Sequence, residues 1–196
     1  MRVASLLSIA VLGLAACTST PTTSMSPDVT RTGRSTSPPM RVATGTATRA
    51  IAHLAGASGS LVSGTLTLVQ TGIGVRIQGD IGGLAPGSTH GFHVHETGDC
   101  SAADASSAGG HFNPDGSPHG KAETPRHHAG DIDNITVDAS GVAHVDATVV
   151  GTVLGGSAST NILGRALVVH AAADDYRTQP SGNSGTRIAC GVVRTP

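Results

Sequence analysis

The stretch Gly91-Phe92-His93-Val94-His95 carries the strongest structural signal in this chain. It is typical of a β-strand, and side chains along a strand point alternately to opposite faces. His93 and His95 therefore share one face, whereas Phe92 and Val94 share the other face and belong to a core. We expect this strand to offer two imidazole nitrogens to one metal ion.

Composition indicates that the rest of the chain is also built from strands. Of its 196 residues, 38% are hydrophobic but only 2% are aromatic, so Val, Ile, Leu and Ala must fill the core. The 27 glycines separate short β-branched runs, which is typical of strands joined by turns. We predict an all-β fold, a sandwich or barrel. The eight expected strands span residues 46–54, 61–70, 74–81, 90–95, 135–137, 142–149, 166–170 and 187–193.

Two long segments, residues 96–134 and 171–186, lack strand character. Long irregular loops in a compact domain are usually functional. The first loop carries four residues of metal-ligand type: His111, His119, His128 and Asp131. Three imidazoles and one carboxylate match a tetrahedral zinc site.

His170 ends the apolar run 166–169, so a strand delivers its side chain. An all-imidazole set suits copper in a tetragonal arrangement. The expected copper ligands are His93, His95, His111 and His170.

Taken together, five stretches resemble the copper/zinc superoxide dismutase family. They are GFHVHETGDC (91–100), SAGGHFNP (107–114), HAGD (128–131), LVVHAAADD (167–175) and GNSGTRIACGV (182–192). The long gap between Cys100 and His111 is more similar to the bacterial branch. The resemblance implies an eight-stranded Greek-key β-sandwich or barrel with two long functional loops. It also implies an enzyme that converts superoxide to oxygen and hydrogen peroxide at a copper centre supported by zinc.

The resemblance further implies a role for each residue. His111 would bridge both metals, Asp174 would hydrogen-bond one ligand of each metal, and Arg187 would guide superoxide to copper. His127 competes with His128, but only His128 keeps the H-x-x-D spacing to Asp131. The other histidines have surface or structural roles: His53, His90, His127 and His144.

The N-terminus has the features of a targeting segment. A short positive start precedes the apolar residues 3–14, and Leu14-Ala15-Ala16-Cys17 resembles a bacterial lipobox. We predict a lipoprotein signal peptide over residues 1–16, a lipid on Cys17, and a disordered Ser/Thr/Pro-rich tether over residues 17–41. The enzyme domain of residues 42–196 would then be anchored in the cell envelope, on the extracytoplasmic face of a membrane. An ordinary secretory signal is the alternative.

Two cysteines remain in the exported domain, Cys100 and Cys190, and we expect them to form a disulfide rather than two free thiols. The family resemblance implies the same pair. From residue 42 onward, eight Lys and Arg stand against twelve Asp and Glu, a formal charge of −4 that disfavours nucleic-acid binding.

Three questions stay open at the level of sequence. The loop before Arg187 lacks lysine, so substrate steering by Lys121, Arg126 or Arg177 cannot be ranked. The domain is a monomer or a homodimer. A copper-buffering protein and a structural sandwich module are the competing functions, and the complete ligand set disfavours both.

Overall fold

The computed structural model describes residues 45–122 and 124–196. The expected signal peptide, Cys17 and the tether lie outside these residues. The described elements are β1 (Arg49–Gly56), β2 (Ser63–Gln70), β3 (Gly74–Gly82), β4 (Thr89–His90), β5 (Phe92–His95), a 3₁₀ helix η1 (Ser106–Ala108), β6 (Ile135–Thr136), β7 (Val142–Val150), β8 (Ala166–His170) and β9 (Arg187–Val192).

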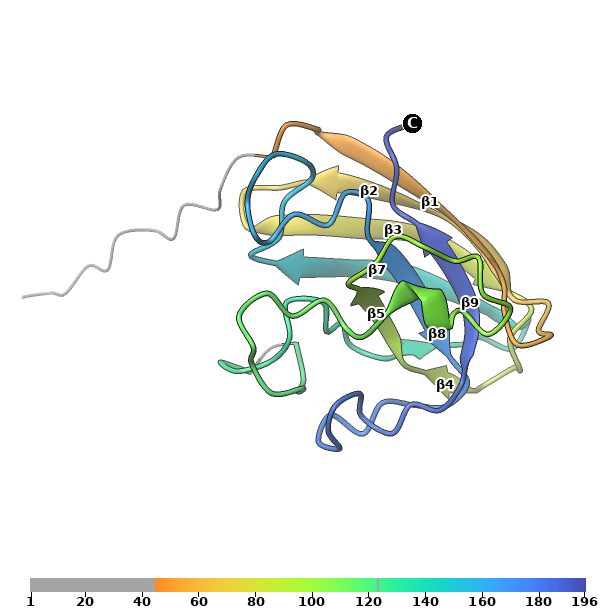
Figure 1. Ribbon diagram of the computed structural model, residues 1–196. Helices are drawn as coiled ribbons and strands as arrows, with labels where there is room; N and C mark the ends of the chain where they lie inside the picture. Colours follow the sequence, from red (N-terminus) through yellow and green to blue (C-terminus); the bar gives the residue numbers. More distant parts are fainter. Residues whose placement is uncertain (1–44, 123) are drawn as a thin grey trace, which may run out of the picture. The chain divides into compact units, whose positions relative to one another are not determined.

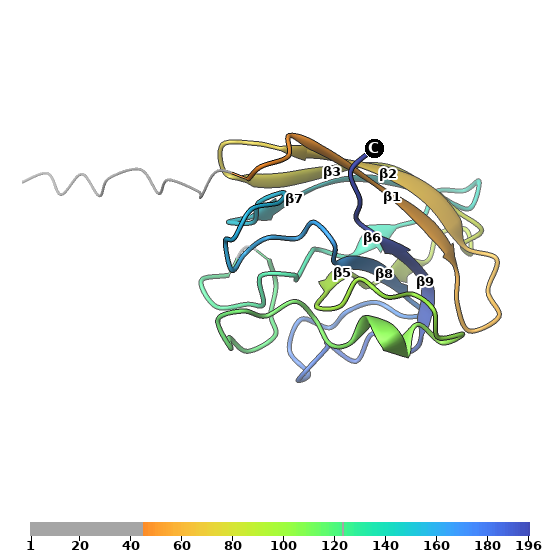
Figure 2. The same cartoon turned by 45° about the horizontal axis from the view of Figure 1, so that its top comes forward.

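Seven of these strands form one antiparallel sheet in the order β5-β8-β9-β1-β2-β3-β7, and β4 pairs with β6. The large sheet curls, so that β1, β2, β3 and β7 form one layer and β5, β8 and β9 face it (Figures 1 and 2). Because β9 pairs with β1, the last strand of the chain lies beside the first described strand. The predicted all-β sandwich or barrel is confirmed.

Alternation along the strands builds the core between the two layers. In β2, Leu66 and Leu68 are fully buried, whereas Thr65 and Thr67 face solvent. Burying one such aliphatic side chain contributes about 2 kcal/mol. The period of two therefore fixes which face of each strand turns inward.

Strand β8 differs because it is buried on both faces. Leu167 and Val169 pack in the main core. Ala166 and Val168 belong to a second cluster with Cys190, beneath the loop that carries η1. A strand covered on both sides holds the side chain at its end in a fixed position, and that side chain is His170.

One expected strand splits in two, so that the eight expected strands become nine. Residues 90–95 change partner at Gly91: His90 pairs with Ile135 in β6, whereas β5 pairs with β8. Gly91 donates its N–H to the Ala172 carbonyl at 2.9 Å, and a Cβ there would lie 2.9 Å from the Cβ of Ser184. Gly91 thus permits close contact between the strand and loop 171–186.

A disulfide joins Cys100 to Cys190, with the two Cα atoms 5.8 Å apart. It ties the loop of residues 96–134 to β9 across 90 residues of sequence and confirms the expected pair. Among the described residues, no helix has the length and apolar character needed to cross a membrane.

Candidate metal centre

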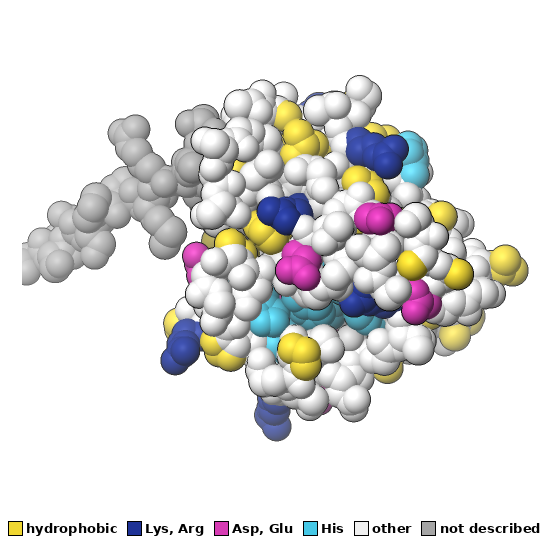
Figure 3. Space-filling view, in the orientation of Figure 1, with side chains coloured by type: hydrophobic (Ala, Val, Ile, Leu, Met, Phe, Trp, Pro, Cys, Tyr) yellow, Lys and Arg dark blue, Asp and Glu magenta, His cyan; other side chains and the backbone are white. Residues whose placement is uncertain are grey.

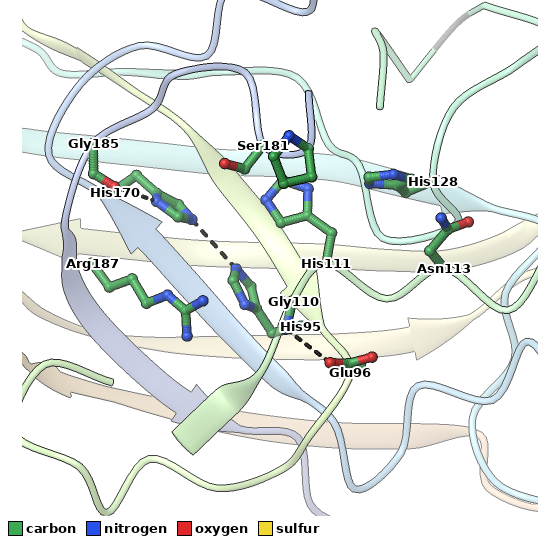
Figure 4. A pocket seen from close by; sticks show the side chains of 11 residues that line it. His95, Glu96, Gly110, His111, Asn113, His128, His170, Ser181, Gly185 and Arg187 are labelled. Carbon is green, nitrogen blue, oxygen red and sulfur yellow. Dashed lines mark hydrogen bonds between the residues drawn. The ribbon is translucent and has the colours of Figure 1, made fainter. Parts of the chain in front are cut away.

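Strands β5 and β8 present three imidazoles to one point. His93 and His95 lie opposite Val168 and Ala166, and His170 ends β8. Nε2 of His95 lies 3.3 Å from Nε2 of His170, as Figure 4 shows.

The hydrogen bonds of the two Nδ1 atoms determine the tautomers of His95 and His170. Nδ1 of His95 donates to the Gly109 carbonyl at 2.9 Å, and Nδ1 of His170 donates to the Gly185 carbonyl at 3.2 Å. In the neutral rings both Nε2 atoms therefore carry lone pairs that face each other. Two opposed lone pairs at this distance favour a cation between them.

The first cluster consists of four buried histidines whose candidate ligand atoms all lie within 4.8 Å of one another: His93, His95, His111 and His170. Nδ1 of His93 and Nε2 of His111 are buried and have no hydrogen-bond partner. Buried polar atoms without a partner are costly. A bound metal ion would satisfy both atoms, so these residues fit a metal.

A second cluster converges on one carboxylate. Oδ1 of Asp131 lies 2.9 Å from Nδ1 of His111, 3.0 Å from Nδ1 of His119 and 3.3 Å from Nδ1 of His128. The other oxygen, Oδ2, accepts the backbone N–H groups of Gly120 and His128. Three imidazole nitrogens around one held carboxylate form a four-ligand set of the kind that zinc prefers.

The two clusters are joined twice. His111 belongs to both, facing one cluster with Nδ1 and the other with Nε2. The carboxylate of Asp174 accepts from Nε2 of His93 at 2.8 Å and from Nε2 of His119 at 2.9 Å. Both bonds use Nε2, so Nδ1 of His93 faces the first cluster and Nδ1 of His119 faces Asp131 in the second.

Burial sets the charge of the first cluster. It lowers the pKa of His95 to about 2, that of His170 to about 3 and that of His111 to about 4. These rings are neutral near pH 7, which leaves their lone pairs available.

In the second cluster, hydrogen bonds between imidazoles and carboxylates together outweigh the effect of burial on the pKa values. Burial acts to lower the pKa of His119, but hydrogen bonds to Asp131 and Asp174 raise it to about 9. Burial acts to raise the pKa of Asp131, yet hydrogen bonds from three imidazoles hold it far below its usual value. Asp131 is therefore ionised across the physiological range.

An open pocket of about 460 Å³ leads to both clusters. Figure 3 shows the hollow with histidine side chains at its floor. His95, His111, His128 and His170 reach this pocket, and Arg187 lines its side. Nη1 of Arg187 donates to the Ala105 carbonyl and Nη2 to the Gly109 carbonyl, both at 2.6 Å.

Arg187 is the one cation that lines this pocket within residues 45–122 and 124–196. Burial lowers its pKa, but a guanidinium keeps its charge in proteins. The pocket lining does not include the three other candidates for steering the substrate, Lys121, Arg126 and Arg177.

Two residues with a supporting role carry no sequence signal. The side chain of Asn134 bonds both the N–H and the carbonyl of Asp174, at 2.8 and 2.9 Å. The side-chain amide of Gln179 does the same for His119, at 2.8 and 2.9 Å. An isolated Asn or Gln in a loop looks like any solvated residue, so only the fold reveals these contacts.

The remaining histidines have the structural roles expected of them. His90 is buried, with Nδ1 2.8 Å from the His170 carbonyl and Nε2 2.7 Å from Oγ of Ser88. His53 contacts Thr65, and His127 contacts its neighbour's carbonyl.

Comparison with known proteins agrees with this geometry. The family described as copper/zinc superoxide dismutase (SODC) matches residues 62–193. A Cu-Zn superoxide dismutase of Aquifex aeolicus (strain VF5) is 39% identical over 149 residues, which are 74% of this chain and 86% of that protein. A superoxide dismutase-like protein of Bacillus subtilis (strain 168) is 44% identical over 123 residues, 61% of this chain and 63% of that protein.

A solved structure of similar shape also exists. The crystal structure of a SOD-like protein from Bacillus subtilis superposes with a TM-score of 0.66 at 40% identity, covering 72% of this chain and 95% of the other. With the family match over most of the described residues, the chain belongs to the copper/zinc superoxide dismutase family and is an oxidoreductase.

Proposed function

We propose that this protein dismutates superoxide in the cell envelope, with copper in the four-histidine cluster and zinc beside it. Overall, two superoxide anions and two protons give one oxygen and one hydrogen peroxide. The observation that carries the proposal is His111, which two buried ligand clusters share beneath a pocket lined by Arg187.

Each proposed copper ligand has a ring nitrogen available for the metal. His93 would bind copper through Nδ1, and His95, His111 and His170 would bind through Nε2. The proposed zinc ligands are His111, His119, His128 and Asp131. Bound copper supplies one-electron redox chemistry, whereas zinc supplies none.

His111 would act on protons as well as on the metals. Its Nε2 faces the copper cluster, and this atom would take up a proton in one half of the cycle and release it in the other. Asp131 contacts Nδ1 and keeps the ring in place. Asp174 fixes the orientation of His93 and His119.

Arg187 would attract and hold the anionic substrate. The predicted domain carries a formal charge of −4, so its mean field repels superoxide. A fixed guanidinium inside a pocket reverses that field locally, an effect that weakens as salt rises.

The envelope location rests on sequence alone. A lipid on Cys17 would hold the enzyme outside the cell membrane, where it meets superoxide that crosses membranes poorly. A Cys17→Ala variant should move from the membrane fraction to the soluble fraction. Membrane retention of that variant would contradict the anchor and leave the enzymatic proposal intact.

The test of activity uses the purified chain loaded with copper and zinc. We expect rapid superoxide decay that survives a chelator, together with one copper and one zinc per chain. His95→Ala should lose copper and activity, whereas the exposed His144→Ala should retain both. Tight metal retention without turnover would instead support the copper-buffering function.

A further inference from the structure

One peptide unit, between Gly109 and Gly110, connects three functional side chains. Its carbonyl oxygen accepts hydrogen bonds from Nδ1 of His95 at 2.9 Å and from Nη2 of Arg187 at 2.6 Å. Its N–H donates to Oε1 of Glu96 at 2.9 Å, the bond drawn in Figure 4. A carboxylate therefore lies on one side of the peptide, and a proposed copper ligand and the substrate-guiding cation lie on the other.

Through its backbone, Glu96 also holds the next peptide unit, between Gly110 and His111. The N–H of Glu96 donates to the Gly110 carbonyl at 2.9 Å. The carbonyl of Glu96 accepts from Nη1 of Arg165, whose guanidinium lies 4.5 Å from the ring centre of Phe112. The backbone that carries the exposed carboxyl group of Glu96 is thus held in place.

Gly109 makes the close approach of that carboxyl possible. It has a φ of +72°, a conformation that costs little only for glycine. A Cβ on Gly109 would lie 2.6 Å from Oε1 of Glu96. The Glu96 side chain therefore occupies the space that a larger residue at position 109 would need.

We propose that Glu96 is a positioning residue that acts on His95 and Arg187 through the Gly109–Gly110 peptide. This inference rests on the proposed function of those two residues. A carboxylate that accepts from a peptide N–H polarises the peptide and makes its carbonyl a stronger acceptor. The hydrogen bond from Nδ1 of His95 to this carbonyl then becomes stronger, so the imidazole ring becomes a more electron-rich ligand. Arg187 is held more firmly as well, because it donates to the same carbonyl.

The test compares wild type with Glu96→Gln and Glu96→Ala in the metal-free and the copper-loaded chain. The glutamine variant keeps an acceptor but loses the charge, so the Gly110 amide should exchange with solvent about fivefold faster. The alanine variant should exchange faster still, and the Nδ1–H signal of His95 should move in both. The copper reduction potential should rise, because a less electron-rich ligand stabilises the oxidised ion less.

Asp104→Asn is the matched control. Asp104 interacts electrostatically with Arg187 and accepts from the N–H of Ser106 at 3.0 Å, but it has no bond to the Gly109–Gly110 peptide. It should change neither the Gly110 amide nor the potential.

Two results would overturn the proposal: unchanged Gly110 exchange in Glu96→Ala, or a copper potential equal to that of wild type in both variants. Gly110 amide exchange and the Nδ1–H signal of His95 are measured by magnetic resonance on the metal-free chain. They test the effect of Glu96 on the Gly109–Gly110 peptide even if the metal-loaded wild type fails to dismutate superoxide. That failure would refute the proposed function instead.

Discussion

His170 and Arg187 lie opposite each other in the register of β8 and β9, just after a shift in the pairing. Val169 pairs with Ala189 and His170 with Arg187, so Ile188 is the extra residue of a β-bulge. Bulges redirect side chains and are common beside active sites. Here the bulge places a proposed copper ligand and the pocket's cation on adjacent strands.

Arg187→Ala should slow superoxide decay by about tenfold or more, because fixed positive charge in a cleft raises association rates by that order. The dependence of the rate on salt should also flatten. Arg187→Lys should recover only part of the rate, since lysine lacks the planar fork that contacts two carbonyls. Stopped-flow decay of superoxide at several ionic strengths measures both effects.

Arg177→Ala supplies the charge-matched control. It removes the same charge from an exposed residue that does not line the pocket. Equal losses in Arg177→Ala and Arg187→Ala would mean that net charge, rather than the pocket, steers the substrate.

Local pattern was sufficient for the fold class and for the candidate ligands that lie together in the two clusters. Alternation in β2 predicts its buried face, and the H-x-H of His93 and His95 predicts a shared face. The spacing to Asp131 identifies His128 rather than His127. Each of these signals spans a few residues of one strand or loop, which is why sequence alone reveals them.

Contacts to backbone atoms leave no mark in the sequence, for a physical reason. Carbonyl acceptors such as those of Ala105 and Gly109 have no residue identity, so no motif marks where Arg187 binds. The split at Gly91 depends on loop 171–186, which is distant in sequence. The same holds for Asn134, whose role appears only once Asp174 lies beside it.

Removing the disulfide should destabilise the protein strongly. The bond closes a loop of 90 residues, and the chain-entropy account gives about 4 to 5 kcal/mol for such a loop. Cys190→Ser should lower the free energy of unfolding by that order in chemical denaturation. It should also free the loop that supplies the Ala105 carbonyl to Arg187.

The third cysteine provides the comparison for this experiment. Cys17→Ser should unfold like wild type, and reductant should destabilise both to the level of Cys190→Ser. A wild-type protein whose unfolding ignores reductant would contradict a stabilising role for the bridge.

His144 should titrate above the usual range of histidine. Nδ1 lies 2.7 Å from Oδ1 of Asp80, and this hydrogen bond raises the pKa of the imidazole, with Asp138 3.4 Å from Nε2. A folded-state pKa above the unfolded one gives stability that is fully present below about pH 6.5. That stability is lost as pH rises through the folded pKa.

Histidine resonances followed against pH measure this shift directly. Asp80→Asn should move the pKa of His144 back toward its ordinary value. An unchanged titration in that variant would assign the shift to something other than Asp80.

Asp174→Asn should weaken metal binding at both clusters, because one carboxylate orients His93 and His119. Loss of such a partner typically costs 10- to 100-fold in metal affinity. Competition with chelators, read separately for copper and zinc, measures the loss. Asp175→Asn is the control, since its exposed carboxylate bonds Thr178 and contacts neither ring. A loss confined to one metal would show that the two clusters are not joined through Asp174.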